Sequence, residues 1–456
     1  MKKNEDIIIN ITSASSGFGI GKFNGMTVFV DNAAVGDELE VHVIKVKKNY
    51  CVAKIKNIIK PSSARTDIDC PVYLSCGGCS FRHIKYNEEL KIKAESVESA
   101  VNRIGKINLK PNPIIPSPLE MHYRNKAQYP VANSQNGLVY GFYAKHSHRV
   151  IPNSDCMLQP EVFKSAMHAV KQWADENSIT AYDTQTKTGI LRHVLLRYAE
   201  KTQQLMVVPV IAQKVLPKSK ELIDCLRQNL GSCLKSVSCN INTKDTNVIL
   251  GKTCKLIYGS EYITDEICGI KLNISPLSFY QVNRSAAEIL YTAAAKYISH
   301  DDHVILDLFC GIGSIGLSVI HSLNSSEHKL YGVEIVPEAV QNAKLNALQN
   351  NINNAEFFCA DASLAARELF NNNNIRPDVV IVDPPRKGCD RQLLLTIAED
   401  FAPKKLIYIS CDPATLARDL KILSEYGYIL NEYTPVDLFP STSHVETIVL
   451  LQKKNS

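Results

Sequence analysis

The sequence lacks any apolar run close to the roughly 18–20 residues that a helix needs to cross a bilayer. Its polar first six residues and the short isoleucine patch after them do not resemble a secretory signal. Glycine and proline, 21 and 20 of 456 residues, are not in excess, which excludes collagen-like and low-complexity disordered chains. No internal repeat is present. We therefore expect a soluble globular protein of the cytoplasm, with no membrane contact and about three domains.

Acidic residues are scarce in the first third of the chain. Residues 1–150 hold 21 Lys and Arg against 13 Asp and Glu, whereas residues 151–456 hold 30 against 33. A basic front part on a near-neutral remainder is typical of a polyanion-binding module joined to an enzyme, although a solvated charged face would give the same count. The 14 cysteines, in a reducing compartment, favour metal binding or catalysis over disulfides.

Residues 1–62 are predicted to form a small β-barrel. Clustered β-branched residues indicate strands at 7–11, 26–30, 38–46 and 51–59, and turns are predicted at five glycines: Gly17, Gly19, Gly21, Gly25 and Gly36. The last two strands carry six lysines and no acidic residue after Glu40: Lys45, Lys47, Lys48, Lys54, Lys56 and Lys60. Small barrels with one basic face commonly bind nucleic acid. We therefore expect Lys45, Lys47 and Lys48 to contact RNA.

The remaining chain is predicted to form two further domains. Residues 63–268 are expected to be mainly β, with one helix near 162–176. A helical pattern at 87–105 lies in the segment 82–113, which we expect to pack on the C-terminal domain. Over 269–456, apolar strands alternate with helical patterns and a β pair closes the chain; the strands are at 304–308, 329–334, 356–360, 379–382 and 405–410. This alternation predicts an α/β fold with a doubly wound, Rossmann-like sheet.

A glycine-rich turn follows the first of these strands. Gly311, Gly313 and Gly316 allow a ligand to approach the backbone at the start of a helix, a spacing that also fits dinucleotide binding. Carboxylates favour a different ligand. Asp307 before the turn suits an amino-acid ammonium, Glu334 suits ribose hydroxyls, and Asp361 suits an adenine amine. Acidic groups at three consecutive strand ends predict a cationic nucleoside ligand, S-adenosylmethionine.

The next two strand ends carry the candidate chemistry. The fourth strand runs into Asp383-Pro384-Pro385, a rigid segment at the edge where doubly wound sheets bind ligands. The fifth strand is followed by Cys411, which therefore lies at the same edge, just before a helix and near Arg386. A helix N-terminus and a nearby cation predict a lowered pKa for this thiol, and therefore a nucleophilic thiolate.

A thiolate is useful to a methyltransferase whose target is carbon 5 of a pyrimidine. Addition of the thiolate to carbon 6 makes carbon 5 nucleophilic enough to take a methyl group, and a base must then remove the carbon 5 proton. Glu446, at the start of the last strand, is the candidate base, because burial can raise its pKa into a useful range. His444 is the rival candidate.

Over essentially its whole length the sequence closely resembles the uracil-5 RNA methyltransferase family. The resemblance implies that Cys411 is the nucleophile and Glu446 the general base. It implies cofactor contacts from Gln281, in a stretch (SFYQVN, residues 278–283) similar to the family's FxQVN motif, and from Phe309, Glu334, Asp361 and Asp383, beside the turn glycines Gly311 and Gly313. Ser314 stands where the family often has Asn. The barrel looks like a TRAM domain, an RNA-binding module of this family.

Four cysteines form a separate pattern: Cys70, Cys76, Cys79 and, 77 residues on, Cys156. Their spacing alone leaves structural zinc and an iron–sulfur cluster open. The resemblance implies a 4Fe–4S cluster, since the iron–sulfur branch of the family has this CxxxxxCGGC arrangement with a distant fourth cysteine. Nearby aromatic and basic residues are candidate RNA contacts, with Arg124 the strongest.

Three alternatives differ in chemistry. A cytosine-5 enzyme would usually carry a cysteine in the fourth-strand motif, which here is Asp383-Pro384-Pro385-Arg386. An NAD-dependent oxidoreductase leaves Cys411 and Glu446 without a role, and a non-catalytic RNA-binding protein leaves the cofactor edge without one.

Family members with both the barrel and the cluster mostly act on 23S ribosomal RNA, so a 23S rRNA loop uridine is the expected substrate and transfer RNA the second. No obligate protein partner is evident.

Overall fold

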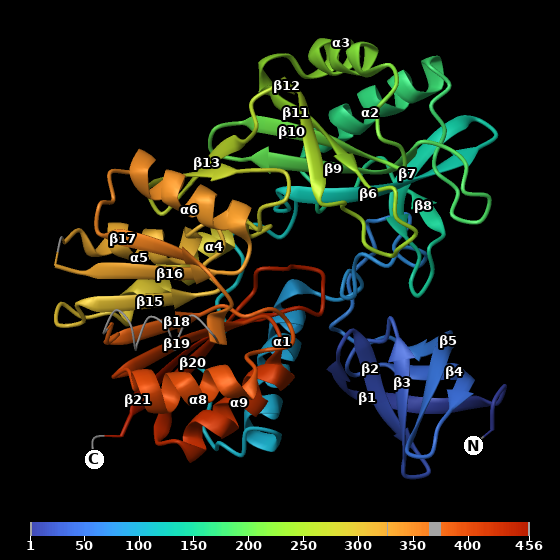
Figure 1. Ribbon diagram of the computed structural model, residues 1–456. Helices are drawn as coiled ribbons and strands as arrows, with labels where there is room; N and C mark the ends of the chain where they lie inside the picture. The colour runs from blue at the N-terminus through green and yellow to red at the C-terminus, as the bar shows by residue number, and fades with distance from the viewer. Residues whose placement is uncertain (1, 326, 364–374, 455–456) are drawn as a thin grey trace.

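A computed structural model describes residues 2–325, 327–363 and 375–454. The chain forms three parts: a small N-terminal barrel, a central sheet with two helices, and a C-terminal sheet between helices (Figure 1). No helix in these described ranges is both long and apolar enough to cross a membrane.

The N-terminal part is a closed barrel of five strands in the order β1-β2-β3-β5-β4. Alternate apolar side chains fill it, among them Ile7, Ile9, Val41 and Ala53, because successive side chains of a strand point to opposite faces. The five strands are β1 (Asp6–Ser15), β2 (Phe18–Phe23), β3 (Met26–Asp31), β4 (Glu38–Val46) and β5 (Tyr50–Lys60).

Strand β2 was not predicted, because its glycines were taken for turns. Gly17 and Gly25, which flank the strand, do have positive φ angles of 84° and 81°. Gly19 and Gly21 lie inside it, where a Cβ atom would come within 2.7 Å of Ala33 Cβ and 2.5 Å of the Asn10 carbonyl oxygen. These two glycines therefore serve close packing within the barrel and not chain reversal.

The central part is a seven-stranded sheet with the order β12-β11-β10-β9-β6-β7-β8. Helices α2 (Glu161–Glu176) and α3 (Ser219–Leu230) pack together on it around the fully buried Trp173. The sequence predicts one helix here, near residues 162–176, and α3 is a second. The strands are β6 (Lys126–Ser134), β7 (Gly137–Tyr143), β8 (Val150–Pro152), β9 (Leu191–Ala199), β10 (Gln204–Ile211), β11 (Leu234–Ile241) and β12 (Thr253–Gly259).

Helix α1 (Tyr86–Arg103) lies far from the C-terminal helices in sequence but beside them in space (Figure 1). It packs against α9 (Pro413–Glu425), and its Val97 and Val101 join the apolar cluster on that face of the C-terminal sheet. The chain after the helix continues along the same sheet, where Asn112 donates hydrogen bonds to Glu432 and Thr434.

The C-terminal sheet has the order β17-β16-β15-β18-β19-β21-β20, with β21 antiparallel to β19. Its central strands are apolar on both faces: Ile381 packs toward one helical layer, and Val380 and Val382 toward the other. Such continuous apolar strands are expected of a parallel sheet covered by helices on both sides. The strands are β15 (Val304–Leu308), β16 (Lys329–Glu334), β17 (Ala355–Cys359), β18 (Val379–Val382), β19 (Lys405–Ser410), β20 (Tyr428–Val436) and β21 (Glu446–Lys453).

The other elements of this part complete its layers. A hairpin, β13 (Ile263–Ile267) and β14 (Ile270–Ile274), precedes the sheet in sequence. The helices are α4 (Arg284–Lys296), α5 (Ser314–Leu323), α6 (Pro337–Gln349) and α8 (Arg391–Leu395), the last continued by a π-helical turn at Thr396–Phe401. The doubly wound sheet predicted from the sequence is present, with the strands at the predicted places.

Candidate active site

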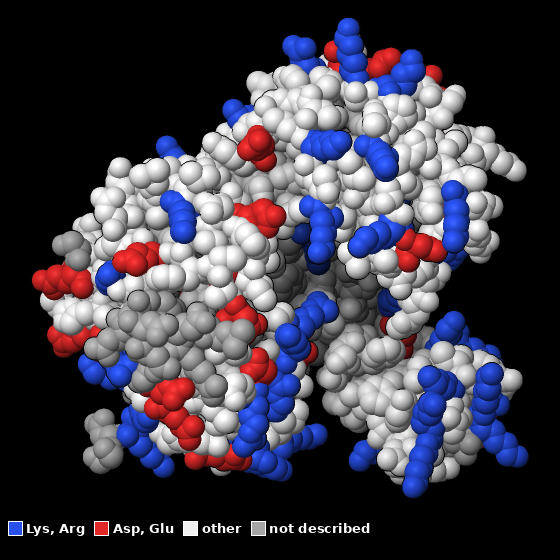
Figure 2. All heavy atoms as spheres, in the orientation of Figure 1, with Lys and Arg blue, Asp and Glu red and all other residues white. Residues whose placement is uncertain are grey.

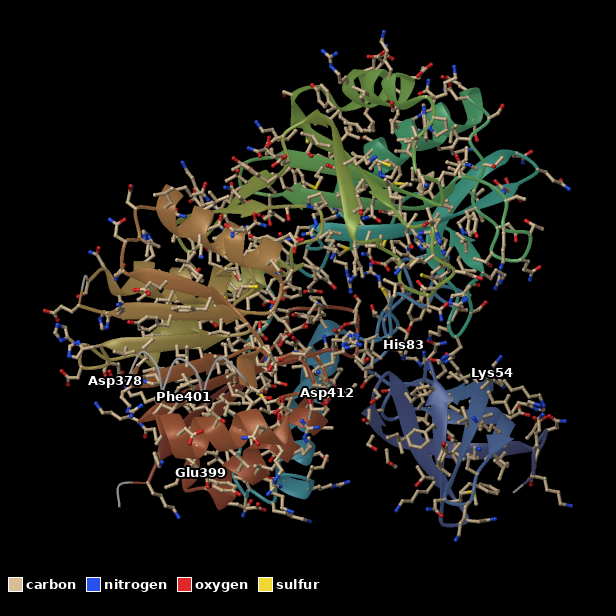
Figure 3. All side chains as sticks on the ribbon, viewed as in Figure 1. Lys54, His83, Asp378, Glu399, Phe401 and Asp412 are labelled. Atoms are coloured by element: carbon tan, nitrogen blue, oxygen red, sulfur yellow. The ribbon has the colours of Figure 1, made fainter. Side chains whose placement is uncertain are left out.

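The candidate groups meet at the carboxyl-terminal edge of the parallel strands. Leu308 pairs with Val382, and Val382 with Tyr408, so the residues that follow these strands emerge side by side. Figure 3 marks the two edges: Asp378 precedes β18, and Asp412 follows β19 on the side that faces α1. A ligand site at the second edge is the general rule for open parallel sheets.

The glycine-rich turn after β15 is open to a ligand. Phe309 has a φ angle of 65°, a left-handed conformation that is strained for a residue with a side chain. Gly311 (φ 56°) would place a Cβ atom in open space, and Gly313 (φ 80°) precedes the first turn of α5. The turn therefore exposes backbone at the start of a helix, as the sequence predicted for a cofactor site.

Asp307 lies beneath this turn and is fully buried. Its Oδ2 accepts a hydrogen bond from the Gly316 amide at 3.0 Å, whereas its Oδ1 has no partner. Burial raises its pKa to about 8, and the charges of Asp383 and Glu334 add to this. A buried acid with an unpaired oxygen is costly, which is common at ligand sites.

The other predicted cofactor residues surround the turn in different ways. The Glu334 carboxylate, at the end of β16, accepts hydrogen bonds from the amides of Gly311 (3.1 Å) and Val336 (2.9 Å). Asp361 is exposed and accepts from the Ser363 amide. Gln281 is buried in the segment before α4. Ser314, in place of the family's Asn, bonds to the Tyr291 hydroxyl and faces the interior.

Cys411 follows β19 and is only partly exposed. The next residue, Asp412, caps α9 by accepting from the amides of Ala414 and Thr415, both at 2.9 Å, which fixes the backbone at the thiol. The predicted lowering of the thiol pKa is wrong. Burial, followed by the charges of Glu446 and Asp383, raises the pKa of Cys411 to about 11, and the opposing effect of Arg386 is smaller.

Glu446 begins β21 directly across from Cys411. Ser410 pairs with Thr447, so the residues that precede Thr447 and follow Ser410 are neighbours. The Glu446 side chain is 3% exposed and its Oε2 has no hydrogen-bond partner. Burial and the charge of Asp383 raise its pKa well above the usual value. A buried, unpaired carboxyl beside a thiol suits a group that exchanges a proton with a bound substrate.

His444 is a weaker base candidate. The Arg386 Nη2 lies 3.1 Å from its Nε2, and burial together with that guanidinium lowers the pKa of His444 to about 4. The imidazole is therefore neutral near pH 7 but has little affinity for a proton. Of the two bases considered from the sequence, the geometry favours Glu446.

The four predicted metal ligands line one cavity of about 90 Å³. Cys70, Cys76 and Cys79 come from the loop before α1, and Cys156 from the loop after β8. Within the described part of the chain, no group of three or more His, Cys, Asp or Glu side chains is placed to hold a single metal ion. The thiols thus surround a common space without converging on one point.

Arg124 connects the two sites. It lines the cysteine cavity, its guanidinium lies 5.7 Å from the Tyr123 ring centre, and its Nε is buried without a hydrogen-bond partner. The same guanidinium is one of the charges that lower the pKa of His444. It therefore lies between the cysteine cavity and the loop that contains His444.

Basic side chains gather around a hollow between the three parts of the molecule (Figure 2). On the barrel, Lys45, Lys47 and Lys48 are exposed at and just after the end of β4. His83, labelled in Figure 3, lies where the barrel meets the rest of the chain, 3.3 Å from the Ala33 carbonyl oxygen. The basic side chains around this hollow suit a polyanionic ligand.

Two asparagines near the site have a positioning role that was not predicted from the sequence. Asn283 caps α4 and donates to the Leu438 carbonyl, and Asn125 donates to the Gln281 carbonyl, so both fix segments that carry predicted site residues. An Asn directly before a helical pattern is a signal for the first. The second depends on a contact between residues 156 positions apart, which no local pattern reveals.

Comparison with known proteins gives a consistent family assignment. Residues 85–454 match the family described as tRNA (Uracil-5-)-methyltransferase, and residues 3–56 match the TRAM domain. Proteins described as uncharacterized RNA methyltransferases are similar along the whole chain. One from Clostridium tetani is 42% identical, covering 99% of this chain and 97% of its own, and one from Clostridium acetobutylicum is 43% identical, covering 99% and 98%.

A solved structure has the same fold. It is the tRNA (uracil-54, C5)-methyltransferase of Pyrococcus abyssi in complex with S-adenosyl-L-homocysteine, with a TM-score of 0.77 and 23% identity over 97% of this chain and all of that chain. This similarity confirms the predicted methyltransferase fold, and the TRAM match together with the closed barrel confirms the predicted N-terminal module.

Proposed function

Because the chain belongs to the tRNA (uracil-5-)-methyltransferase family, we propose that it methylates carbon 5 of a specific uridine in 23S ribosomal RNA. The observation that carries the proposal is the meeting of Cys411, Glu446 and Asp383 at one sheet edge. The register of β19 with β21 brings Glu446 next to Cys411, and Asp383 acts electrostatically on both.

S-adenosylmethionine, when bound, would supply an electrophilic methyl group at this edge. The residues present fit such a ligand: open space above Gly311, an unpaired buried oxygen on Asp307 and the carboxylate of Glu334. Gln281, Phe309, Gly313, Asp361 and Asp383 complete the proposed cofactor contacts. Acidic groups in a buried setting favour a cationic ligand over a dianionic dinucleotide.

Cys411 would form a bond from sulfur to carbon 6 of the uracil. The ring then carries an electron-rich carbon 5, which takes the methyl group. Glu446 removes the remaining proton from carbon 5, the electron pair restores the C5–C6 double bond, and the sulfur of Cys411 leaves as a thiolate. The raised pKa of Glu446 suits this role, because a base must hold the proton that it abstracts.

The target base must leave its stack to reach Cys411, since carbon 6 is inaccessible between stacked neighbours. A uridine in a single-stranded loop would need the least energy for this. The exposed Lys45, Lys47 and Lys48 and the partly buried Arg124 are the proposed RNA contacts. An enzyme that acts on ribosomal RNA would work in the cytoplasm.

The test uses RNA that contains 5-fluorouridine, in which carbon 5 has no proton for Glu446 to remove. With labelled S-adenosylmethionine, the wild-type enzyme should form a stable covalent adduct, and Cys411→Ala should form none. Glu446→Gln should form the adduct and should also accumulate it on ordinary RNA. An adduct that persists in Cys411→Ala would refute the nucleophile.

Transfer RNA is the second candidate substrate. The matching family is described by its action on tRNA, and the Pyrococcus abyssi structure is of an enzyme for uracil-54 of tRNA. The cysteine cavity supports ribosomal RNA, since family members with both this cluster and the barrel mostly act there. Mapping 5-methyluridine in both RNAs from a deletion strain decides between them. RNA cytosine-5 methylation is the third candidate, disfavoured by the absence of a cysteine at Asp383-Pro384-Pro385.

We also propose that Cys70, Cys76, Cys79 and Cys156 hold a 4Fe–4S cluster. The four thiols line one cavity, and the resemblance to the iron–sulfur branch of the family, which carries the same cysteine arrangement, favours the cluster over zinc. When bound, such a cluster would join the loop before α1 to the loop after β8. A structural role is proposed, because methyl transfer moves no electrons.

A further inference from the structure

The loop of residues 437–445 joins β20 to β21 and leads directly into Glu446. Val436 pairs with Glu446 across the two strands, so Asp437 is the first loop residue beside the base. Any shift at Asp437 is transmitted to the pair that sets the position of Glu446. The contacts that hold Asp437 are therefore of interest for the reaction.

Asp437 is fully buried and forms an ion pair with Lys93 of α1, Oδ1 to Nζ, at 2.7 Å. The two residues are 344 positions apart in the chain. Its Oδ2 accepts from the Tyr86 hydroxyl at 2.9 Å, and its Oδ1 also accepts from the Phe439 amide at 3.0 Å. Both carboxylate oxygens are thus used to fix the first turn of the loop.

Lys93 is 1% exposed, and its ammonium has three acceptors for its three protons. These are Glu89 Oε1 at 2.6 Å, Asp437 Oδ1 at 2.7 Å and the Phe439 carbonyl oxygen at 3.0 Å. Two of the three belong to the loop. A fully satisfied, water-excluded ammonium imposes a definite geometry on its partners.

Docking of α1 does not by itself require this arrangement. Val97 and Val101 already bury the helix against the C-terminal sheet. Buried ion pairs contribute little net stability compared with apolar residues of similar size, but they define which partner sits where. Lys93 lies on the buried side of α1, four residues before Val97. Its burial is therefore better explained by positioning of the loop than by packing of the helix on the sheet.

The middle of the loop is held from the same segment of the chain. The Ser441 carbonyl oxygen accepts from the amides of Ser80 and Phe81 at 2.8 and 3.0 Å. Ser441 itself has a φ angle of 67°, which a loop without external support would relax. The loop is thus fixed at its start and its middle by residues 80–93.

We propose that Lys93 is a positioning residue for proton abstraction: through Asp437 and Phe439 it sets the placement of Glu446. This inference rests on the proposed uracil-5 methylation. It predicts a selective defect. Addition of Cys411 and methyl transfer come before the step that needs Glu446, so only resolution of the covalent intermediate should slow.

The test compares Lys93→Met with Lys91→Met, which breaks only the exposed pair with Glu88 on the same helix. On 5-fluorouridine RNA, Lys93→Met should form the adduct within about 3-fold of the wild-type rate, since no proton is removed. On ordinary RNA its turnover should fall about 100-fold, as expected for a displaced catalytic group, and a methylated protein–RNA adduct should accumulate. Lys91→Met should match the wild type in both assays.

Asp437→Asn is the second variant, in case Lys93→Met does not fold by circular dichroism. It removes the ionic partner of Lys93 but keeps an acceptor for Tyr86, and it should show the same adduct accumulation. Wild-type turnover in a folded variant, or an equal fall in both assays, overturns the positioning role. A wild-type enzyme that forms no adduct on 5-fluorouridine RNA would instead refute the proposed function.

Discussion

Cys411 is subject to opposing influences that its local sequence does not reveal. The sequence predicts an activated thiolate, because a helix follows Cys411 and because Arg386 comes just after a strand that ends at the same sheet edge. In the folded chain, burial and two carboxyl groups outweigh that guanidinium and raise the pKa of the thiol to about 11. In the free enzyme Cys411 is therefore mainly a thiol, and only a small fraction of the molecules carries the nucleophilic thiolate.

This predicts a steep pH dependence for Cys411. Below a pKa of about 11, the thiolate fraction rises about tenfold for each pH unit, so alkylation by iodoacetamide should become about 100-fold faster between pH 7 and pH 9. Mass spectrometry of the Cys411 peptide in the free enzyme measures the rate. Glu446→Gln removes a carboxylate that raises this pKa and should therefore react faster at each pH. A rate that levels off below pH 8 would contradict the raised pKa.

At the scale of elements, the buried strands of the C-terminal sheet were easier to predict than the glycine-rich strand of the barrel and the second helix of the central part. Strands β15, β16, β18 and β19 lie where the apolar runs predicted them, because a strand buried on both faces has a continuous apolar sequence. Strand β2 and helix α3 were missed. Gly19 and Gly21 resemble turn residues until the packing of Ala33 and Asn10 against them is known.

The loop before α1 is the element on which the cluster proposal can be tested. Anaerobically purified protein should be brown and contain about four iron atoms per chain. Cys79→Ser should lose the colour and most of the iron, because it removes one of the four thiols of the cavity. Cys359→Ser, at an exposed cysteine outside the cavity, is the matched control and should keep both. Colourless wild-type protein that carries zinc would disprove the assignment.

At the scale of the whole molecule, the barrel, the central sheet and the catalytic sheet surround one hollow with a largely basic rim (Figure 2). The basic excess of residues 1–150 indicated a polyanion but not its path. In the folded chain, α1 and the loop before it, both within residues 1–150, contact the loop of residues 437–445 that leads into Glu446.

We expect the lysines of the barrel to contribute to the salt dependence of the RNA affinity. Replacing Lys45, Lys47 and Lys48 together by Gln should reduce the slope of log affinity against log salt by about 2, at about 0.7 per contact to single-stranded RNA. Filter binding at several salt concentrations measures the slope. Turnover at saturating RNA should not change, because these side chains lie on the barrel. Lys164→Gln on α2, an exposed lysine paired with Asp155, is the control. An unchanged slope in the triple variant would exclude this face from RNA binding.

The sequence by itself determined the alternation of strands and helices, the glycine turn and the presence of Cys411, Glu446 and the four clustered cysteines, because each depends on residue type and short-range spacing. Only the tertiary structure decided that Glu446 lies across from Cys411, that burial raises both pKa values, and that Lys93 reaches Asp437. These depend on strand register, desolvation and contacts over hundreds of residues, which arise only when the chain packs.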